Sequence, residues 1–244
     1  MVDRLELRYG DVVAVSQLSF AVEPGRVVGL LGPNGCGKTS TLRAVVGLLR
    51  PVGGRVVVNG VPQGSIAARA QVAYVPDEPT GLDELCAEEL LALVRTLYRS
   101  PAGYDVRAEA LVHAFDIAAR SRVFLGALSH GQRRIVSMIA AFALARPLVV
   151  VDEATAALDP EAVAVLREVL RALARGGGGV LLATQELAFA ERVCDDVVLL
   201  SAGRVVASGT VAEVAGEGTL EQAFLDAVGA GSRLAEVRRD LGAL

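Results

Sequence analysis

The fold of this 244-residue chain is decided by the stretch Gly32-Pro33-Asn34-Gly35-Cys36-Gly37-Lys38-Thr39. This stretch fits the phosphate-loop pattern G-x-x-x-x-G-K-[ST], and it lies between a strand-like run, residues 26–31, and a helix-like one. Backbone N–H groups of such a loop wrap phosphates, Lys38 reaches the β and γ oxygens, and Thr39 offers a hydroxyl to Mg²⁺. The following helix adds the positive end of its dipole. We therefore expect a nucleoside triphosphate as the ligand.

Composition narrows the class of protein. A chain of this length can bury one substantial core. Its net charge is −4, and it has no Lys/Arg-rich run, so we expect no nucleic-acid partner. The first residues are charged and no apolar signal core follows them, which favours the cytosol. Three cysteines without C-x-x-C spacing and two histidines argue against a disulfide framework and a zinc site, so the expected metal is Mg²⁺.

The sequence also predicts a layered α/β fold without a membrane span. The longest apolar stretch, residues 135–151, is interrupted by Arg146-Pro147 and favours a buried helix, a turn and a buried strand. Continuous apolar runs are typical of central parallel strands, and they alternate with helical segments. Hairpin turns at Asn59-Gly60 and Ala202-Gly203 suggest an antiparallel β unit before the phosphate loop and a small ladder near the C-terminus. The expected strands are residues 27–31, 55–58, 72–75, 148–151, 180–183, 197–200 and 204–207.

A second motif, Leu128-Ser129-His130-Gly131-Gln132, precedes an apolar helix and lies about twenty residues before an apolar run that ends in Asp152-Glu153. Ser129 and Gln132 have the S-x-x-Q spacing of a capping box, which marks a helix start and offers a second anion site. An ordinary helix cap would explain Ser129, but it would not explain Gly131 or the acidic pair.

Together these motifs resemble the nucleotide-binding subunit of ATP-binding-cassette (ABC) transporters, whose signature Leu-Ser-Gly-Gly-Gln is matched at four of five positions. The resemblance runs from about residue 5 to residue 229. It implies a P-loop NTPase fold of the α/β class, with a mostly parallel central sheet, an antiparallel β subdomain and a helical signature subdomain at about residues 81–146. The ATPase domain would span residues 1–229, and residues 230–244 would form a short helical tail.

The resemblance further implies an ATPase that uses ATP with Mg²⁺ and powers a separate transmembrane permease. Two such subunits sandwich two ATP molecules head to tail, so we expect a homodimer or heterodimer on the cytoplasmic face of the cell membrane. Residues 219–225 and 74–79 look like the branch that serves drug, lipid and polysaccharide exporters, which favours export. The permease would set the transported substrate.

Site residues follow from the same resemblance and from the chemistry of each side chain. Asp152 would hold the water shell of Mg²⁺ together with Thr39, while Glu153, expected on the opposite side, would be the general base. Lys38 completes the catalytic set. Tyr9 would stack on adenine or else cap the small core of its subdomain. The predicted nucleotide-binding residues are Tyr9, Gly32, Pro33, Asn34, Gly35, Cys36, Gly37, Lys38, Thr39, Ser40, Ser129, His130, Gly131 and Gln132.

Three residues depart from the family pattern. Asp77 stands where a glutamine is usual, and it would reach Mg²⁺ through a water or act only as a hinge toward the permease. His130 replaces a signature glycine and would donate to phosphate or face solvent. Gln185 follows the strand 180–183 where the family has a histidine. Glutamine donates a hydrogen bond, so Gln185 would do part of the work of a histidine that acts by hydrogen bonding. It cannot take up a proton or positive charge near neutral pH, so we predict hydrolysis below the family's usual rate, with Gln185 in the catalytic set.

The departures keep a second function open, a hydrolysis-impaired subunit that acts as the regulatory half of a heterodimer. A role in translation or cluster assembly fits less well, because the translation group carries two cassettes in one chain. Cys36 lies near a helix N-terminus beside Lys38, a setting expected to lower the pKa of its thiol. A small residue that merely fits the loop is the alternative.

Overall fold

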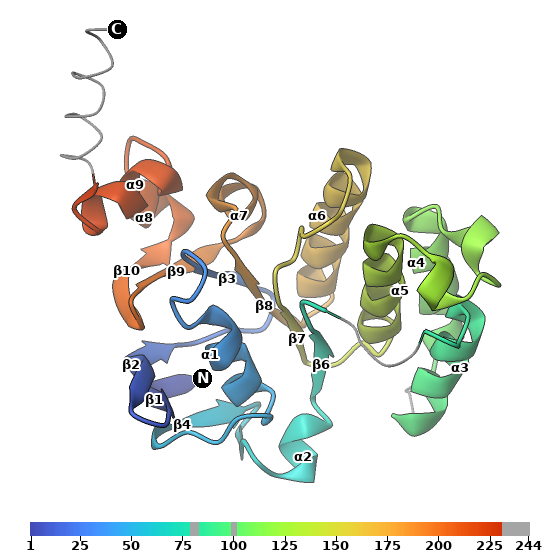
Figure 1. Ribbon diagram of the computed structural model, residues 1–244, viewed down its shortest axis with the longest axis horizontal. Helices are drawn as coiled ribbons and strands as arrows, with labels where there is room; N and C mark the ends of the chain where they lie inside the picture. Colours follow the sequence, from blue (N-terminus) through green and yellow to red (C-terminus); the bar gives the residue numbers. More distant parts are fainter. Residues whose placement is uncertain (79–82, 99–101, 231–244) are drawn as a thin grey trace, which may run out of the picture.

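A six-stranded sheet runs through the middle of the molecule (Figure 1), in the computed structural model that describes residues 1–78, 83–98 and 102–230. The strand order is β10-β9-β3-β8-β7-β6. Its strands are β3 (Val27–Leu31), β6 (Val72–Val75), β7 (Leu148–Val151), β8 (Gly179–Thr184), β9 (Asp196–Ser201) and β10 (Arg204–Thr210). All neighbours are parallel except β10, which pairs antiparallel with β9. The loops that follow β3, β6, β7 and β8 therefore lie along one edge of the sheet.

Both faces of this sheet are covered, because consecutive residues of each strand point to opposite sides. In β3, Val27 and Leu31 belong to one apolar cluster, whereas Val28 and Leu30 belong to the other. Helix α1 (Lys38–Val45) and a second sheet pack against the second cluster. The first face is covered by α5 (His130–Phe142), α6 (Pro160–Arg175) and α7 (Leu187–Val193) (Figure 1). This double cover explains why the parallel strands are continuous apolar runs in the sequence.

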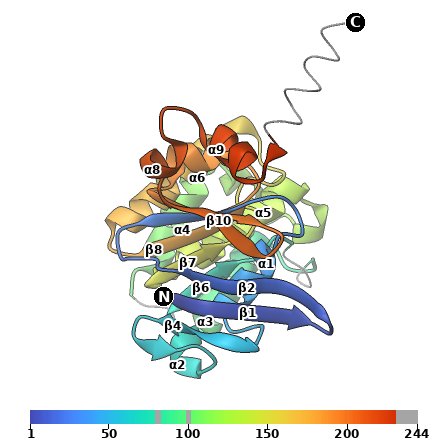
Figure 2. The same cartoon turned by 90° about the vertical axis from the view of Figure 1, so that its left-hand side faces the viewer.

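The second sheet is antiparallel, with the order β2-β1-β4-β5, and Figure 2 shows it stacked below the central sheet. Its strands are β1 (Val2–Tyr9), β2 (Val12–Phe20), β4 (Gly53–Val58) and β5 (Val61–Pro62). The predicted turn at Asn59-Gly60 is confirmed, since Val58 pairs with Val61 across it. The prediction that this unit lies before the phosphate loop is wrong in part. Strands β4 and β5 come after the loop, and β4 pairs directly with β1.

A helical lobe lies beside the sheet (Figure 1), in the region where the sequence predicts a signature subdomain. Its helices α3 (Ala87–Leu97) and α4 (Tyr104–Ala114) pack against α5. The Tyr104 hydroxyl donates to a carbonyl of α5 at 3.4 Å, and Arg107 Nε donates to the carbonyl at its C-terminal end at 2.8 Å. The remaining helices are α2 (Ile66–Arg69), η1 (Ala118–Arg120), η2 (Leu125–Ala127), α8 (Val211–Ala215) and α9 (Leu220–Ala227).

The long apolar stretch 135–151 divides as predicted into the end of α5, a turn and β7. No helix within the described residues has the length and apolar character needed to cross a membrane. The fold class predicted from the sequence is confirmed by the mostly parallel sheet, the antiparallel unit and the helical lobe. The tail predicted at residues 230–244 lies outside the described residues beyond residue 230.

Candidate nucleotide site

The phosphate loop leaves β3 and takes a shape that only glycine allows at several points. Gly32, Gly35 and Gly37 have φ angles of 152°, 79° and 108°. A Cβ atom on Gly32 would lie 2.2 Å from the carbonyl oxygen of Leu200 in β9, and one on Gly37 would lie 2.7 Å from that of Ala14. Gly37 is also the N-cap of α1, and no side chain of the described residues caps this helix end. The first N–H groups of α1 are therefore available to an anion.

Lys38 is held inside the loop. Its side chain is 4% exposed, and Nζ donates to the carbonyl oxygens of Gly32 at 2.8 Å and Pro33 at 3.2 Å. Nζ also lies 3.2 Å from Oε1 of Glu153. The ammonium group thus has carbonyl partners in the loop and one carboxylate partner. Because that carboxylate is its only anionic partner among the described residues, a bound phosphate would compete with Glu153 for Lys38.

Asp152 follows β7 and is fully buried next to Thr39. The Thr39 hydroxyl donates to Asp152 Oδ1 at 3.2 Å, whereas Oδ2 is buried without a hydrogen-bond partner among the described residues. Burial raises the pKa of the Asp152 carboxyl, and the hydroxyl of Thr39 opposes this shift. A buried carboxylate oxygen with no donor is a ready ligand for a cation.

Glu153 does not lie on the opposite side of the chain from Asp152, as the sequence suggested. Its backbone has φ 44°, in the left-handed region, so the alternation of an extended strand ends there. Both carboxylates consequently face the phosphate loop, Asp152 at Thr39 and Glu153 at Lys38. The structure brings together four of the six residues expected to act on the terminal phosphate and Mg²⁺: Lys38, Thr39, Asp152 and Glu153.

The signature motif starts α5 with the predicted capping box, which is confirmed. The backbone N–H of Gln132 donates to Ser129 Oγ at 3.2 Å, and the backbone N–H of Ser129 donates to Gln132 Oε1 at 3.2 Å. A Cβ atom on Gly131 would lie 2.3 Å from the carbonyl oxygen of Ala157, in the loop that follows β7. No hydrogen bond joins residues 129–132 to the phosphate loop in the part of the chain that the structure describes. The signature cap and the phosphate loop are therefore not linked by a hydrogen bond within the described chain.

A family model described as ABC transporter matches residues 15–156, a segment that contains the phosphate loop, the signature and Asp152-Glu153. This chain belongs to the ABC transporter family. The resemblance drawn from the three motifs is thereby confirmed. The chain is an ABC ATPase, and ATP is its substrate.

Individual relatives agree with this assignment. The chain is 34% identical to the ABC-type transporter ATP-binding protein EcsA of Bacillus subtilis (strain 168), over 87% of each chain. It is 32% identical to the lipopolysaccharide export system ATP-binding protein LptB of Acidithiobacillus ferridurans, over 89% of this chain and 92% of that protein. A solved structure described as an ATP binding subunit of an ABC transporter superposes with a TM-score of 0.87 at 33% identity, covering 93% of this chain and 98% of that one.

Two further nucleotide residues predicted for the ABC ATPase are Tyr9, beside the phosphate loop, and Asn34, within it. Tyr9 ends β1 with its side chain 46% exposed, and its hydroxyl is 3.3 Å from Oγ of Ser40 in α1. This contact places the partly exposed Tyr9 side chain next to the start of α1. Asn34 is exposed as well.

Gln185 follows β8 at the same edge of the sheet as the phosphate loop. Leu31, which precedes Gly32, pairs with Thr184. The Gln185 side chain is exposed, and no hydrogen bond to it is formed by the described residues. It is therefore free to meet a ligand at the loop, although it lacks the charge of an imidazolium.

The prediction that the pKa of the Cys36 thiol is lowered is wrong. Burial raises this pKa, and the nearby charge of Lys38 only partly offsets the shift. The thiol is 3% exposed and packs toward Gly32. Proximity to a helix N-terminus does not outweigh the loss of water, which a sequence pattern does not report.

Asp77 lies in the loop after β6, half-exposed, with Oδ1 3.7 Å from Nη1 of Arg134. No direct contact links it to Thr39 or Asp152 among the described residues. Arg134 was missed in the sequence, where it reads as one of two adjacent arginines after the signature. It is fully buried, and it donates to the backbone carbonyls of Pro76 (3.3 Å), Asp77, Asp152 and Glu153.

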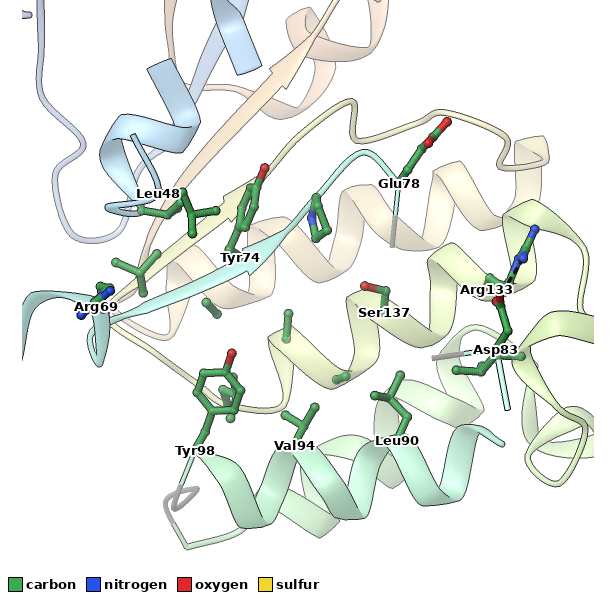
Figure 3. A pocket seen from close by; sticks show the side chains of 18 residues that line it. Leu48, Arg69, Tyr74, Glu78, Asp83, Leu90, Val94, Tyr98, Arg133 and Ser137 are labelled. Carbon is green, nitrogen blue, oxygen red and sulfur yellow. Dashed lines mark hydrogen bonds and ion pairs between the residues drawn. The ribbon is translucent and has the colours of Figure 1, made fainter. Parts of the chain in front are cut away.

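A cavity of about 670 Å³ lies between the β6 strand and the helical lobe (Figure 3). Leu90 and Val94 of α3 and its C-cap residue Tyr98 line it on one side, and Tyr74 and Leu48 line it on the sheet side. Its lining is mostly apolar, with Asp83 and Arg133 at one end and Arg69 at the other (Figure 3). The cavity therefore borders the loop of Asp77 without being part of the nucleotide site.

Proposed function

We propose that this ABC ATPase couples ATP hydrolysis to export through a separate permease, with Glu153 as the general base. The observation that carries this proposal is the pairing of the two carboxylates with consecutive loop residues. Asp152 lies at Thr39 and Glu153 at Lys38, each at 3.2 Å. Phosphoryl transfer depends mainly on positioning and charge stabilisation, and these four side chains supply both.

Mg²⁺ fits the pair formed by Thr39 and Asp152. Asp152 Oδ2, which has no hydrogen-bond partner among the described residues, and the Thr39 hydroxyl oxygen are ligand atoms of the kind that this ion prefers. When bound, the ion neutralises charge on the β and γ phosphates. Asp77 is a further candidate that would act through a water, as proposed from the sequence.

Glu153 and Lys38 act in sequence in this proposal. Lys38 turns from Glu153 to the γ-phosphate oxygens, which leaves the carboxylate free to accept a proton from the attacking water. The water oxygen bonds to the γ phosphorus as the bond to the ADP oxygen breaks, and inorganic phosphate leaves. Gln185 donates a hydrogen bond near the γ-phosphate and carries no charge, so turnover is slower than with a histidine.

The signature supports a dimer. In this proposal the start of α5 is an anion site, and among the described residues it forms no hydrogen bond with the phosphate loop of its own chain; its residues are Ser129, His130, Gly131 and Gln132. We assign this site to the ATP held by a second nucleotide-binding subunit, identical or different. One chain then supplies the base and the other supplies the signature.

Export and membrane attachment rest on the relatives and on the cavity of Figure 3. LptB, which the chain matches over most of its length, is named for an export system. The cavity offers an apolar groove beside the Asp77 loop, where a helix of the permease could insert without touching the nucleotide site. This arrangement supports a peripheral position on the cytoplasmic face of the membrane.

A regulatory half of a heterodimer is the second candidate. Two observations favour it: Gln185 lacks the charge of histidine, and His130 adds a bulky side chain to the signature. Such a subunit would bind ATP and dimerise with little turnover.

Steady-state phosphate release from Mg-ATP separates these functions, measured for the chain, Glu153→Gln and Gln185→His, with and without the permease. Loss of a general base should lower turnover about 100-fold or more in Glu153→Gln. A histidine at position 185 should raise turnover roughly tenfold, since one charged hydrogen bond in the transition state is worth about that factor. ATP affinity serves as the control and should stay within about threefold in both variants.

If Glu153→Gln retained turnover, Glu153 would not be the general base. An unchanged rate in Gln185→His would show that the glutamine suffices. Tight ATP binding without turnover, restored by Gln185→His, would instead make the chain the regulatory half.

A further inference from the structure

We propose that Arg134 is a positioning residue that couples the Asp77 loop to the catalytic carboxylates. This inference rests on the proposed roles of Asp152 and Glu153, and it adds a residue that neither the motifs nor the family match singles out. Its basis is one buried guanidinium that holds the backbone of two loops at once.

The contacts of Arg134 divide between the two loops by nitrogen atom. Nη1 donates to the carbonyl oxygens of Pro76 and Asp77, which follow β6. Nη2 donates to the carbonyl oxygens of Asp152 and Glu153, which follow β7. The guanidinium is planar with its donors in a fixed fork, so the two pairs of carbonyls are held at a fixed separation. Lysine, with a single ammonium group, cannot bridge them in the same way.

The position of Arg134 in the fold means that this bridge also links helix α5 to the two loops. β6 and β7 are parallel neighbours, with Val75 opposite Val151, so their loops leave the same edge of the sheet. Arg134 is carried by α5, five residues after the cap Ser129, which is about 7.5 Å along a helix. A displacement of α5 would therefore reach both loops through one side chain.

Glu153 needs such support, because its backbone is in an unfavourable region. A φ of 44° in a residue with a side chain costs free energy and persists only where the surroundings enforce it. The bond from Arg134 to the Glu153 carbonyl is one such constraint. The same guanidinium also faces the Asp77 carboxylate at 3.7 Å. The loop that borders the cavity of Figure 3 and the loop that bears the proposed base are thus linked through a single charged group.

A purely structural role is the competing explanation, since buried carbonyls need donors whatever their function. The two explanations differ in what a conservative change would affect. A structural arginine affects folding, nucleotide binding and turnover together. A positioning residue affects turnover while leaving folding and ATP affinity almost intact.

The test compares Arg134→Lys with Arg167→Lys in the full chain. Arg167 lies in α6, is partly exposed and pairs with Glu168 at 3.3 Å, so it controls for the same change on another helix outside the nucleotide site and the cavity. Steady-state phosphate release gives kcat and KM, a fluorescent ATP analogue gives the dissociation constant, and thermal unfolding reports the folded state. We expect Arg134→Lys to lose roughly tenfold or more in kcat, with KM and ATP affinity within about threefold. Arg167→Lys should match the wild type.

Wild-type kcat in Arg134→Lys would overturn the inference. A fall in kcat would also overturn it if the melting temperature and the ATP affinity fell markedly in the same variant. Glu153→Gln, measured alongside, keeps the two proposals apart. If it retains full turnover, the proposed base is wrong. If it is inactive while Arg134→Lys is fully active, only the coupling by Arg134 fails.

Discussion

The absence of a single methyl group allows the phosphate loop to pass β9. At Gly32 a Cβ atom would sit 2.2 Å from a backbone oxygen of Leu200, and this oxygen belongs to a paired strand that cannot move aside. A Cβ atom added at Gly35 would have nothing within 4 Å, although φ is positive there too. The two glycines of one loop therefore differ in what a substitution meets.

We expect Gly32→Ala to lose ATP binding and several kcal/mol of stability, because both a clash and a disfavoured φ must be relieved. Gly35→Ala meets only the disfavoured φ and should cost about 1 kcal/mol. Urea denaturation and titration with a fluorescent ATP analogue measure both effects. Equal losses in the two variants would show that β9 yields at this contact.

At this scale the sequence predicted the residues of the loop and the acidic pair, because spacing alone fixes them. It could not predict the direction of the Glu153 side chain, which depends on a left-handed φ. Nor could it predict the direction of the pKa shift of the Cys36 thiol, because burial raises this pKa. Arg134 escaped notice because its partners are backbone carbonyls from residues 18 to 58 positions away, and no motif records a backbone contact.

At the scale of the element, the start of α5 is both a helix cap and a proposed ATP contact. Thr210 caps α8 with the same reciprocal bonds, from Glu213, but lies far from the motifs in sequence. The two caps therefore form a matched pair with one functional difference.

Ser129→Ala and Thr210→Ala should each lower the free energy of unfolding by about 1 kcal/mol, the usual effect of losing a cap. Only Ser129→Ala should also lower ATP turnover, because only it removes a hydroxyl from the proposed anion site. Phosphate release and urea denaturation, run on both variants, check the pair. Equal turnover in both would restrict Ser129 to a structural role.

Elements buried on both faces were predictable, whereas the N-terminal hairpin was not identified as two strands. β3 and β7 are continuous apolar runs, and the phosphate loop ties β3 to its helix. In β1, by contrast, the buried Leu5 and Leu7 alternate with charged residues, and Arg4 interrupts the strand with φ 46°. Its pairing with β4 also spans the phosphate loop in sequence, which a local pattern cannot reveal.

At the scale of the whole molecule, burial makes several acids hard to ionise. The pKa values of Cys36 and Cys194 are raised, and those of Tyr74 and Tyr104 are raised to about 12, with desolvation the largest cause in each case. In the unfolded chain these groups ionise near 9 and 10. Above those values the unfolded chain loses protons that the folded chain retains.

Folding stability should therefore be fully present below about pH 9 and decline as the pH rises toward 12. The sign follows because the unfolded state binds fewer protons in this interval. Urea midpoints at pH 7.5, 9 and 10.5 measure the decline, and return to pH 7.5 tests reversibility. A midpoint that stays constant to pH 10.5 would show that these groups reach water in the folded state.

The overall architecture followed from the sequence because the phosphate loop, the signature and the acidic pair occur together in one chain. The signature cap and the phosphate loop share no hydrogen bond among the described residues, so the proposed dimer rests on the resemblance to the family and not on a contact within the chain.

The strand order also bears on how the protein is made. Val27 pairs with Val180, 153 positions later, and Val28 pairs with Asp196, 168 positions later. On the ribosome, the strand that bears the phosphate loop emerges long before either neighbour exists. Contacts this distant are slow to form and leave apolar strands exposed in the meantime. The nascent chain must therefore wait for most of its length to be translated before the ATP site can assemble, and a premature stop before β8 leaves no nucleotide pocket.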